Sequence, residues 1–483
     1  METCRITTAG VYELLNSGSI SGLKGLRFHF IGAGGIGMSG LAKVLIRNKA
    51  IVSGSDSEVS EVTSELCRIG ADIKSGHNAD NLKEETDAVV ISAAIKEDNP
   101  ELKAARERGC EIFKYAELLG GLMNCYEGIA ISGTHGKSTT SSWLTYCLRE
   151  AGLEPNFIVG AKISQMDSSS GVGDGRYFIA ESCEYDRSFL NLKPKIAAIL
   201  NIEQDHLDYY KDEDEIVEAF REFAEGVKPG GLVIASGEDV NTGKVIAEAG
   251  GERRFETFGF DEGCNFSAQN IRLADGLYSF DVYHNGEFVG ATQIAVPGKH
   301  NILNGLAVFG MGVNAGVEEA QMLETLGEFT GIDRRLMLKG CVNGITVLDD
   351  YAHHPTEIRA SLCAIRERYE PKRLWCVFQP HQYSRTRFLL DDFAESFKLA
   401  DVTIVPEIYF VRDTEAERRQ INSEILVERI GGNGTDAKFI DGFGAICEYL
   451  KENVRVGELV VSMGAGDIWK VSDEYIQWLR DNC

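Results

Sequence analysis

The sequence predicts an α/β protein built from three consecutive domains. Short apolar runs alternate with helical patterns along the chain, and several of these runs end in glycine-rich or acidic turns. Such runs are typical of buried parallel strands, with helices crossing from one strand to the next. In addition, 483 residues exceed what a single hydrophobic core usually serves. We place the domains at residues 1–125, 126–330 and 331–483.

The bulk composition narrows the class of function. A formal net charge of −25 argues against nucleic acid or a membrane surface as a partner. No apolar run is long enough to cross a membrane and no export signal opens the chain, so we expect a cytoplasmic protein. The 12 cysteines stand singly, without a Cys-x-x-Cys pair, which fits reduced thiols and gives no zinc or disulfide framework. An anionic ligand must therefore be held by local cations and backbone amides.

The first domain opens with a glycine-rich turn. A strand at 26–31 leads into Gly32-Ala33-Gly34-Gly35-Ile36-Gly37, and a helix follows to about Arg47. The glycines fit the dinucleotide fingerprint, and Asp56, after a strand at 50–53, lies where a ribose-binding acid would fall. Further strands at 88–92 and 111–113 flank a helix at 100–108. The pattern predicts a phosphate-bearing ligand at a helix N-terminus, without saying which nucleotide binds.

The second domain begins with a loop suited to ATP. An apolar strand at 128–132 precedes Gly133-Thr134-His135-Gly136-Lys137-Ser138-Thr139, and a helical pattern runs from Ser141 through Leu148. Glycines let amides approach phosphate oxygens, the lysine can reach the β- and γ-phosphates, and the serine hydroxyl can ligate Mg²⁺. The match to the P-loop pattern is incomplete because Ile131 occupies the place of its first glycine. We still predict that the loop binds ATP, and we expect Lys137 to be exposed.

Acidic residues follow two later strands of this domain. The strand at 177–180 ends in Glu181-Ser182-Cys183-Glu184, and the strand at 196–200 leads to Asp205-His206. Ligands of open α/β sheets gather at the carboxyl ends of the strands, and Mg²⁺ takes carboxylate oxygens together with substrate phosphates. The sequence therefore predicts Mg²⁺ beside the ATP loop. Short alternating runs with Asp-Gly and Asn-Gly turns at 255–292 predict antiparallel hairpins, and a helix follows at 297–313.

The third domain repeats the strand–helix pattern from about Gly331. A strand at 345–348 ends in Asp349-Asp350-Tyr351-Ala352-His353-His354, and a helix runs to about Arg368. The strand at 374–378 ends in Gln379-Pro380-His381-Gln382-Tyr383-Ser384-Arg385. Later strands are expected at 402–405 and 459–462. Polar residues again follow the carboxyl ends of strands, where a ligand would bind.

With these motifs in order, the chain resembles the Mur ligases over nearly its whole length. The matching segments are the first glycine loop, the short ATP loop, Asp205-His206, His300-Asn301-x-x-Asn304, Arg334-Arg335, Asp349–Pro355 and Gln379–Arg387. The resemblance implies the three-domain Mur ligase architecture. It comprises a Rossmann-like N-terminal domain that binds a UDP substrate, a P-loop-type central ATPase domain, and a Rossmann-like C-terminal domain that completes the ATP and amino-acid sites.

The first glycine loop is similar to that of the alanine-adding member of the family. The implied activity joins L-alanine to the carboxylate of UDP-N-acetylmuramate, with ATP as the energy source and with Mg²⁺ or, alternatively, Mn²⁺ as the metal. The carboxylate would attack the γ-phosphate to give an acyl phosphate and ADP, and the amine would then displace phosphate. The product is a peptidoglycan precursor, and the protein would be a monomer or a homodimer.

The resemblance also implies a role for each matching residue. The ATP loop, Gly133 to Thr139, would hold the phosphates, with Asn301 on adenine, Asp350 on the ribose and Arg334 or Arg335 on the γ-phosphate. The metal ligands would be Ser138, Glu181 and His206. The UDP moiety would contact Gly32, Gly34, Gly35, Gly37, Ser39, Asp56 and Ser92. Alanine would face Tyr351, His353 and Arg385, and the residues acting directly on the reaction would be Lys137, Arg335, His353 and Arg385.

One departure from the family pattern lies next to the amino-acid site. Gln382 stands where the family usually has an arginine, so we expect Arg385 to carry more of the binding of the alanine carboxylate. Alternatively, Arg385 pairs only with a nearby acid such as Asp391 or Asp392.

Three other functions remain open from the sequence. A nicotinamide-dependent oxidoreductase would use the first glycine loop but leave the ATP loop idle. A non-catalytic nucleotide-binding protein would leave the acidic and arginine positions idle. A sister ligase that adds a preformed tripeptide to UDP-N-acetylmuramate is the nearest alternative.

Overall fold

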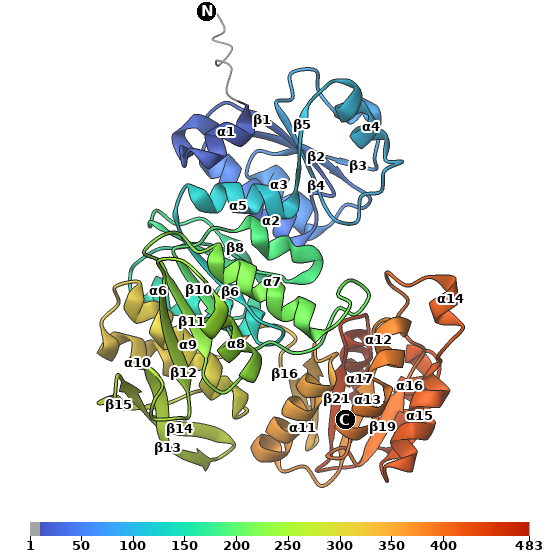
Figure 1. Cartoon of the computed structure of the whole chain (residues 1–483). Helices are drawn as coiled ribbons and strands as arrows, with labels where there is room; N and C mark the ends of the chain where they lie inside the picture. The colour runs from blue at the N-terminus through green and yellow to red at the C-terminus, as the bar shows by residue number, and fades with distance from the viewer. Residues whose placement is uncertain (1–9, 483) are drawn as a thin grey trace, which may run out of the picture. The chain divides into compact units, whose positions relative to one another are not determined.

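The computed structural model describes residues 10–482, which form α/β units with three sheets (Figure 1). The chain divides into two compact units. The first comprises the residues up to Ile202, together with Ile216–Phe266 and Ala307–Thr325. The second comprises Glu203–Glu215, Ser267–Leu306 and the chain from Leu326 onward. The predicted α/β class is confirmed, whereas the three domain boundaries stay predictions.

The first sheet carries the glycine-rich loop. Its five parallel strands have the order β3-β2-β1-β4-β5 and follow one another as β1 (Arg27–Ile31), β2 (Ile51–Asp56), β3 (Asp72–Ser75), β4 (Ala88–Ile91) and β5 (Glu111–Lys114). The helices of this part are α1 (Val11–Asn16), α2 (Ile36–Arg47), α3 (Glu61–Arg68), α4 (Pro100–Glu107) and α5 (Tyr115–Asn124), with short 3₁₀ turns η1 (Ile20–Leu23) and η2 (Ala79–Asn81). The strand order changes direction at β1, and the loop after β1 is where such sheets bind ligands.

The rest of the first unit is a mostly parallel sheet around the ATP loop. Its strands run in the order β12-β11-β10-β6-β9-β7-β8, and only the edge pair β7–β8 is antiparallel. The bounds are β6 (Glu127–Ser132), β7 (Asn156–Ile163), β8 (Ser168–Gly171), β9 (Tyr177–Glu181), β10 (Ile196–Ile199), β11 (Leu232–Ser236) and β12 (Arg254–Gly259). The accompanying helices are α6 (Lys137–Glu150), α7 (Glu213–Glu225), α8 (Val240–Glu248) and the 3₁₀ turn η3 (Tyr185–Asn191). Strand β6 lies centrally, between β10 and β9, so the ATP loop at its end lies between the carboxyl ends of these two strands.

The second unit contains the predicted hairpins and a six-stranded sheet. The hairpin strands are β13 (Phe266–Ala274), β14 (Leu277–His284) and β15 (Glu287–Gln293), and they precede α9 (His300–Asn314) and α10 (Glu319–Glu328), of which Ala307–Thr325 belongs to the first unit. The predicted start of the hairpins at residue 255 is wrong, because β12 pairs with β11 in parallel. The sheet has the order β16-β17-β21-β18-β19-β20 and is parallel except for the β16–β17 pair. Its strands are β16 (Met337–Val342), β17 (Ile345–Asp350), β18 (Leu374–Phe378), β19 (Val402–Val405), β20 (Asp436–Phe439) and β21 (Leu459–Met463). Its helices are α11 (Pro355–Tyr369), α12 (Tyr383–Phe388), α13 (Leu390–Ser396), α14 (Glu415–Arg418), α15 (Ser423–Gly432), α16 (Phe443–Asn453) and α17 (Trp469–Asn482).

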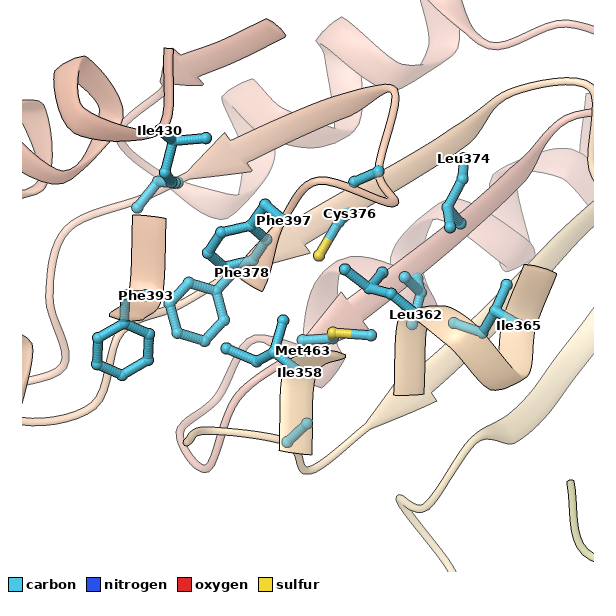
Figure 2. Close-up of a cluster of buried hydrophobic side chains, with 14 of the residues drawn as sticks. Ile358, Leu362, Ile365, Leu374, Cys376, Phe378, Phe393, Phe397, Ile430 and Met463 are labelled. Atoms are coloured by element: carbon cyan, nitrogen blue, oxygen red, sulfur yellow. The ribbon is translucent and has the colours of Figure 1, made fainter. Parts of the chain in front are cut away.

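Strand β18 explains why the core strands appear as continuous apolar runs. Leu374, Cys376 and Phe378 point to one face of the sheet and join the cluster that includes Ile358, Leu362 and Ile365 of α11 (Figure 2). Trp375 and Val377 point to the other face and join residues of α16 and α17. Because successive side chains alternate between faces and both faces are covered by helices, every position of the strand must be apolar.

Most predicted elements are confirmed to within a few residues. The clearest difference is α6, which begins at Lys137 rather than at Ser141. Its first turn is Lys-Ser-Thr-Thr, which carries no apolar periodicity because it belongs to the phosphate-facing end of the helix. Among residues 10–482, no helix is both long enough and apolar enough to cross a membrane.

Candidate active site

The ATP loop has the geometry of an anion-binding turn. It joins the buried strand β6 to the N-terminus of α6, with Gly133 at φ +140° and Gly136 at φ +83°. Both values lie in the region that side chains disfavour, and a Cβ on Gly133 would stand 2.9 Å from the Cβ of Leu200. These two glycines therefore fix the turn that aims the first N–H groups of α6 at a ligand.

Asn201 anchors this loop from the end of β10. Its side-chain carbonyl accepts from His135 N at 2.8 Å, its amide donates to His135 O at 3.1 Å, and its own carbonyl oxygen accepts from Thr134 N at 3.0 Å. No motif in the sequence pointed to Asn201. The only signal was its place at the carboxyl end of a strand.

The side chain of Lys137 is only 13% exposed, so the expectation of an exposed lysine is wrong. Its Nζ lies 2.5 Å from Gly133 O, 3.0 Å from Thr134 O and 2.9 Å from a carboxylate oxygen of Glu184. Burial alone would lower the pKa of Lys137, but the neighbouring charge of Glu184 raises it above its ordinary value. The lysine is therefore a fixed cation, and Glu184, which the sequence analysis left without a role, is its internal counter-ion.

Ser138 and Glu181 form a pair of oxygen ligands beside the lysine. The serine hydroxyl donates to Glu181 Oε2 at 2.8 Å, and Gly160 N donates to the same oxygen at 2.8 Å. A Cβ on Gly160 would lie 2.2 Å from that oxygen, so any larger residue here would displace the Glu181 carboxylate. A hydroxyl and a carboxylate beside a phosphate loop are the hard oxygen donors that Mg²⁺ prefers, and this pair fits the predicted metal.

The glycine-rich loop of the first sheet is held by Asp56. Gly32 has φ +83°, and Gly34 N donates to Asp56 Oδ2 at 2.7 Å. The predicted ribose-binding acid thus also fixes the loop itself. Gly37 is required for a different reason, because a Cβ there would lie 2.5 Å from the ring of Tyr115. Ser39 is buried and donates within α2, to Ile36 O at 2.9 Å.

A cavity of about 290 Å³ extends from the glycine-rich loop to Glu181, the carboxylate that accepts from Ser138. Four of the predicted substrate and metal residues line this cavity: Gly35, Gly37, Ser92 and Glu181. Tyr115, Gly160 and Cys183 also line it. Burial and the charge of Glu181 raise the pKa of Tyr115, so this hydroxyl stays protonated and can donate. A ligand that reaches from the first sheet to Glu181 would fill this cavity.

In the second unit, Arg334 and Arg335 lie against Tyr351. Their guanidinium carbons are 5.0 and 5.4 Å from the centre of its ring. Arg334 donates to Asp349 at 3.1 Å, and Arg335 lies 3.2 Å from Glu357. Each of the two cations is therefore held by its own internal carboxylate, Arg334 by Asp349 and Arg335 by Glu357.

Asp350 is buried at the end of β17 and accepts from Ala352 N at 2.6 Å and Leu336 N at 2.8 Å. Burial raises its pKa to about 6, although Arg335 and the two amides act in the other direction. Asn301 lies in the first turn of α9, where its amide donates to Pro297 O at 2.7 Å.

Arg385 is buried and paired with Asp205. Its Nη2 lies 2.9 Å from Asp205 Oδ1, and its Nε also donates to that oxygen, at 3.1 Å. Burial would raise the pKa of Asp205, but Arg385 and then His206 hold it well below its usual range. The alternative partners proposed from the sequence are wrong, because Asp391 pairs with Arg429 and Arg385 pairs with Asp205.

The remaining residues of this unit surround that ion pair. His206 has φ +55°, and its backbone N–H donates to Asp205 at 2.7 Å. Gln382 is buried and lines the same small pocket as Arg385, and its side-chain nitrogen has no hydrogen-bond partner among the described residues. His353 Nδ1 lies 3.1 Å from Tyr351 O and 3.2 Å from Glu357. Two acceptors at Nδ1 place the proton there, which leaves Nε2 as the basic nitrogen of neutral His353.

Three family models match the chain in succession. The model for the Mur ligase family, catalytic domain, matches residues 27–127, the Mur ligase middle domain matches 131–312, and the Mur ligase, glutamate ligase domain matches 334–466.

Two curated relatives share similar levels of identity with the chain. The UDP-N-acetylmuramate–L-alanine ligase of Caldanaerobacter subterraneus subsp. tengcongensis is 43% identical over 453 residues, which are 93% of this chain and 97% of that protein. The enzyme of the same name from Acetivibrio thermocellus is 42% identical over 452 residues, covering 93% and 95% of the two chains.

Solved structures show the same fold. The crystal structure of UDP-N-acetylmuramate-alanine ligase MurC from Thermotoga maritima is 27% identical with a TM-score of 0.78, and covers 95% of this chain and 100% of that one. A murein peptide ligase from Psychrobacter arcticus has a TM-score of 0.71 at 24% identity, with 95% and 100% coverage. At that identity the second likeness concerns the fold alone.

Proposed function

The chain belongs to the Mur ligase family, and we propose that it is the ATP-dependent ligase that joins L-alanine to UDP-N-acetylmuramate. Its fold is the N-terminal, middle and C-terminal arrangement of that family. The reaction makes a peptidoglycan precursor and releases ADP and phosphate. The relatives that carry this activity in their names match more than nine-tenths of the chain, which separates it from an oxidoreductase.

One observation from the geometry supports the proposal most directly. The cavity that begins at Gly35 and Gly37 ends at Glu181, whose carboxylate touches Ser138 of the ATP loop. A UDP-sugar held by the first loop would extend its muramoyl carboxylate toward the ATP phosphates. A carboxylate is a poor electrophile, and its attack on the γ-phosphate converts one of its oxygens into a leaving group. Catalysis is then mainly positioning and charge neutralisation.

Lys137 is the cation that we assign to the β- and γ-phosphates. Its ammonium already lies at the N-terminus of α6, where phosphate oxygens would take the place of Glu184. Mg²⁺, when bound, neutralises phosphate charge, and Ser138 and Glu181 would hold it. The second-metal role of His206 and the adenine, ribose and γ-phosphate roles of Asn301, Asp350, Arg334 and Arg335 stay predictions from the family resemblance.

The amino acid is assigned to residues of the second unit. Alanine carries a carboxylate, which a guanidinium group can bind through two hydrogen bonds in a bidentate manner. Its ammonium group must lose a proton before the nitrogen can attack the acyl carbon. Arg385 is the proposed carboxylate ligand. His353 is the proposed base, because the proton on its Nδ1 leaves Nε2 free to accept another.

The test is phosphate release by the purified full-length chain. With ATP, Mg²⁺, UDP-N-acetylmuramate and L-alanine together, we expect stoichiometric phosphate and a product heavier by one alanyl residue. Omitting either the muramate or alanine should abolish the signal, and chelating the metal should do the same. Release that requires the murein tripeptide in place of alanine would identify the sister ligase and reject the proposal. Sustained release without a muramate would reject both ligase assignments.

A further inference from the structure

A fully buried carboxylate that the reaction does not use lies beneath the glycine-rich loop. Glu101, in the first turn of α4, has no exposed surface. Its Oε2 accepts from His29 Nε2 at 2.9 Å and from Ser55 Oγ at 2.7 Å. Its Oε1 accepts from Asn78 N at 2.9 Å and from Asn81 Nδ2 at 2.8 Å. Four donors therefore saturate both oxygens.

The Glu101 carboxylate at the centre of this network carries a negative charge. Burial would raise the pKa of Glu101, but the hydrogen bonds from His29, Ser55 and the two asparagines lower it to about 2, so the carboxylate is ionised at neutral pH. The other ring nitrogen of His29, Nδ1, lies 3.0 Å from Ser53 Oγ, so both nitrogens of the ring have a partner. The N-terminal end of α4 adds favourable partial charge. A buried ion that is so fully satisfied fixes the geometry of the groups around it.

The group that Glu101 fixes most directly is the end of β2. While the Ser55 hydroxyl donates to Glu101, the Ser55 carbonyl accepts from Gly32 N at 2.9 Å and from Ala33 N at 3.0 Å. The next residue, Asp56, accepts from Gly34 N at 2.7 Å. Three successive amides of the glycine-rich loop are therefore attached to two residues, and one of these is tied to the buried carboxylate.

We propose that Glu101 is a positioning residue for the UDP-sugar: it sets the end of β2, and through Ser55 it sets the loop that receives the nucleotide. This inference rests on the proposed function, because it takes UDP-N-acetylmuramate as the ligand of that loop. Glu101 itself does not touch the ligand. The competing explanation is that the network only stabilises the first sheet. In that case, any substitution that destabilises this sheet to a similar degree would lower the affinity for UDP-N-acetylmuramate equally.

The test measures binding of UDP-N-acetylmuramate and of ADP separately, by calorimetry, to the full-length chain and to Glu101→Gln. The substitution keeps the shape but places an NH₂ group against two of the four donors. We expect the affinity for UDP-N-acetylmuramate to fall about tenfold or more, the effect of losing charged hydrogen bonds at one anchor. The affinity for ADP should stay within about twofold, because the ATP loop shares none of these contacts.

Leu102→Ala is the matched control. Leu102 is the next residue of α4, is 1% exposed, and packs in the apolar cluster of the same sheet without joining the network. The Leu102→Ala substitution should lower the melting temperature and leave the affinity for UDP-N-acetylmuramate unchanged. If Glu101→Gln does not fold, Ser55→Ala replaces it, since it removes the hydroxyl link and keeps the carbonyl that holds the loop.

Each outcome decides the question. Normal UDP-N-acetylmuramate affinity in the folded variant overturns the positioning role alone. Equal losses of affinity in Glu101→Gln and Leu102→Ala, at similar melting temperatures, overturn it in favour of general stabilisation. Failure of the unchanged protein to bind UDP-N-acetylmuramate defeats the proposed function, and the inference with it.

Discussion

Removing the Lys137 ammonium should reduce both activity and stability, and the two losses should be separable. In Lys137→Ala, the phosphates lose their cation and Glu184 loses its counter-ion. The side chains of Lys137 and Glu184 are only 13% and 3% exposed, so water cannot replace the lost partner. If Lys137 were exposed and unpaired, its replacement by alanine would be expected to change the rate but not the stability.

The magnitudes follow from this burial. Removing one partner of a buried ion pair costs about 3–5 kcal/mol, because the other charge is left uncompensated. For a domain of about 200 residues, each kcal/mol shifts the melting temperature by roughly 2–4 °C, so we expect a decrease of about 10 °C. Loss of a cation that neutralises the transferring phosphoryl group should lower kcat by about 10³-fold.

The double variant Lys137→Ala/Glu184→Gln distinguishes the two effects. An amide in place of the stranded carboxylate removes the buried charge, so the double variant should recover most of the melting temperature of Lys137→Ala. It should recover none of the rate, because the phosphates still lack their cation. Thermal unfolding and coupled phosphate release measure the two quantities on the same samples. Near-normal turnover in a folded Lys137→Ala protein would refute the phosphate assignment, and an unchanged melting temperature would refute the role of the buried pair.

Two further predictions concern the second unit. Arg385→Lys should raise the KM for alanine about tenfold or more and leave the KM for ATP unchanged, because an ammonium cannot bind a carboxylate in two-pronged fashion. Adding Gln382→Arg to that variant should partly restore the KM, and a normal alanine KM in the single variant would reject the assignment. Burial raises the pKa of Asp350 to about 6, above the unfolded value of about 3.9, so the folded state binds this proton more tightly. Stability from this group is therefore greatest below pH 4 and is lost as the pH rises to about 6, by up to about 3 kcal/mol. Asp350→Asn should flatten that part of the stability profile, and an identical profile in both proteins would contradict it.

The sequence was sufficient for most elements and for the glycine turns because these depend on local patterns, whereas the roles of the site residues stay predictions. The strand at 374–378 is apolar at every position since helices cover both of its faces, and glycines 133 and 136 stand where the turn needs positive φ. The polar partners could not be found in that way. Arg385 and Asp205 are 180 residues apart, and several acids lie closer in sequence to Arg385 than Asp205 does. Only the tertiary packing of the second unit, which contains both residues, decides which acid lies opposite Arg385.

The same limitation applies to Gly160 and Glu101. Gly160 has no unusual φ, and glycine is favoured there only because Glu181 and Ser138 occupy the space of a Cβ. Glu101 looks like an ordinary acid in the first turn of a helix, and its position gives no sign of four donors converging on it. Burial of a charged side chain is a tertiary property, which hydrophobic periodicity cannot predict.

The cations assigned to anionic substrates share one arrangement, and it explains how an acidic protein can bind them. Lys137 in the first unit lies 2.9 Å from Glu184, and in the second unit Arg334, Arg335 and Arg385 lie 3.1, 3.2 and 2.9 Å from Asp349, Glu357 and Asp205. With a net charge of −25, the chain has no overall field to attract a triphosphate or a muramoyl carboxylate. Each internal acid instead keeps a largely buried cation in place, with 8 to 26% of its side chain exposed, so that binding would exchange one anion for another rather than strip water from a fully exposed ion. The affinity for each substrate then depends on how well its phosphate or carboxylate competes with the internal acid. Replacing that acid by its amide should therefore change the affinity for the substrate that the cation binds.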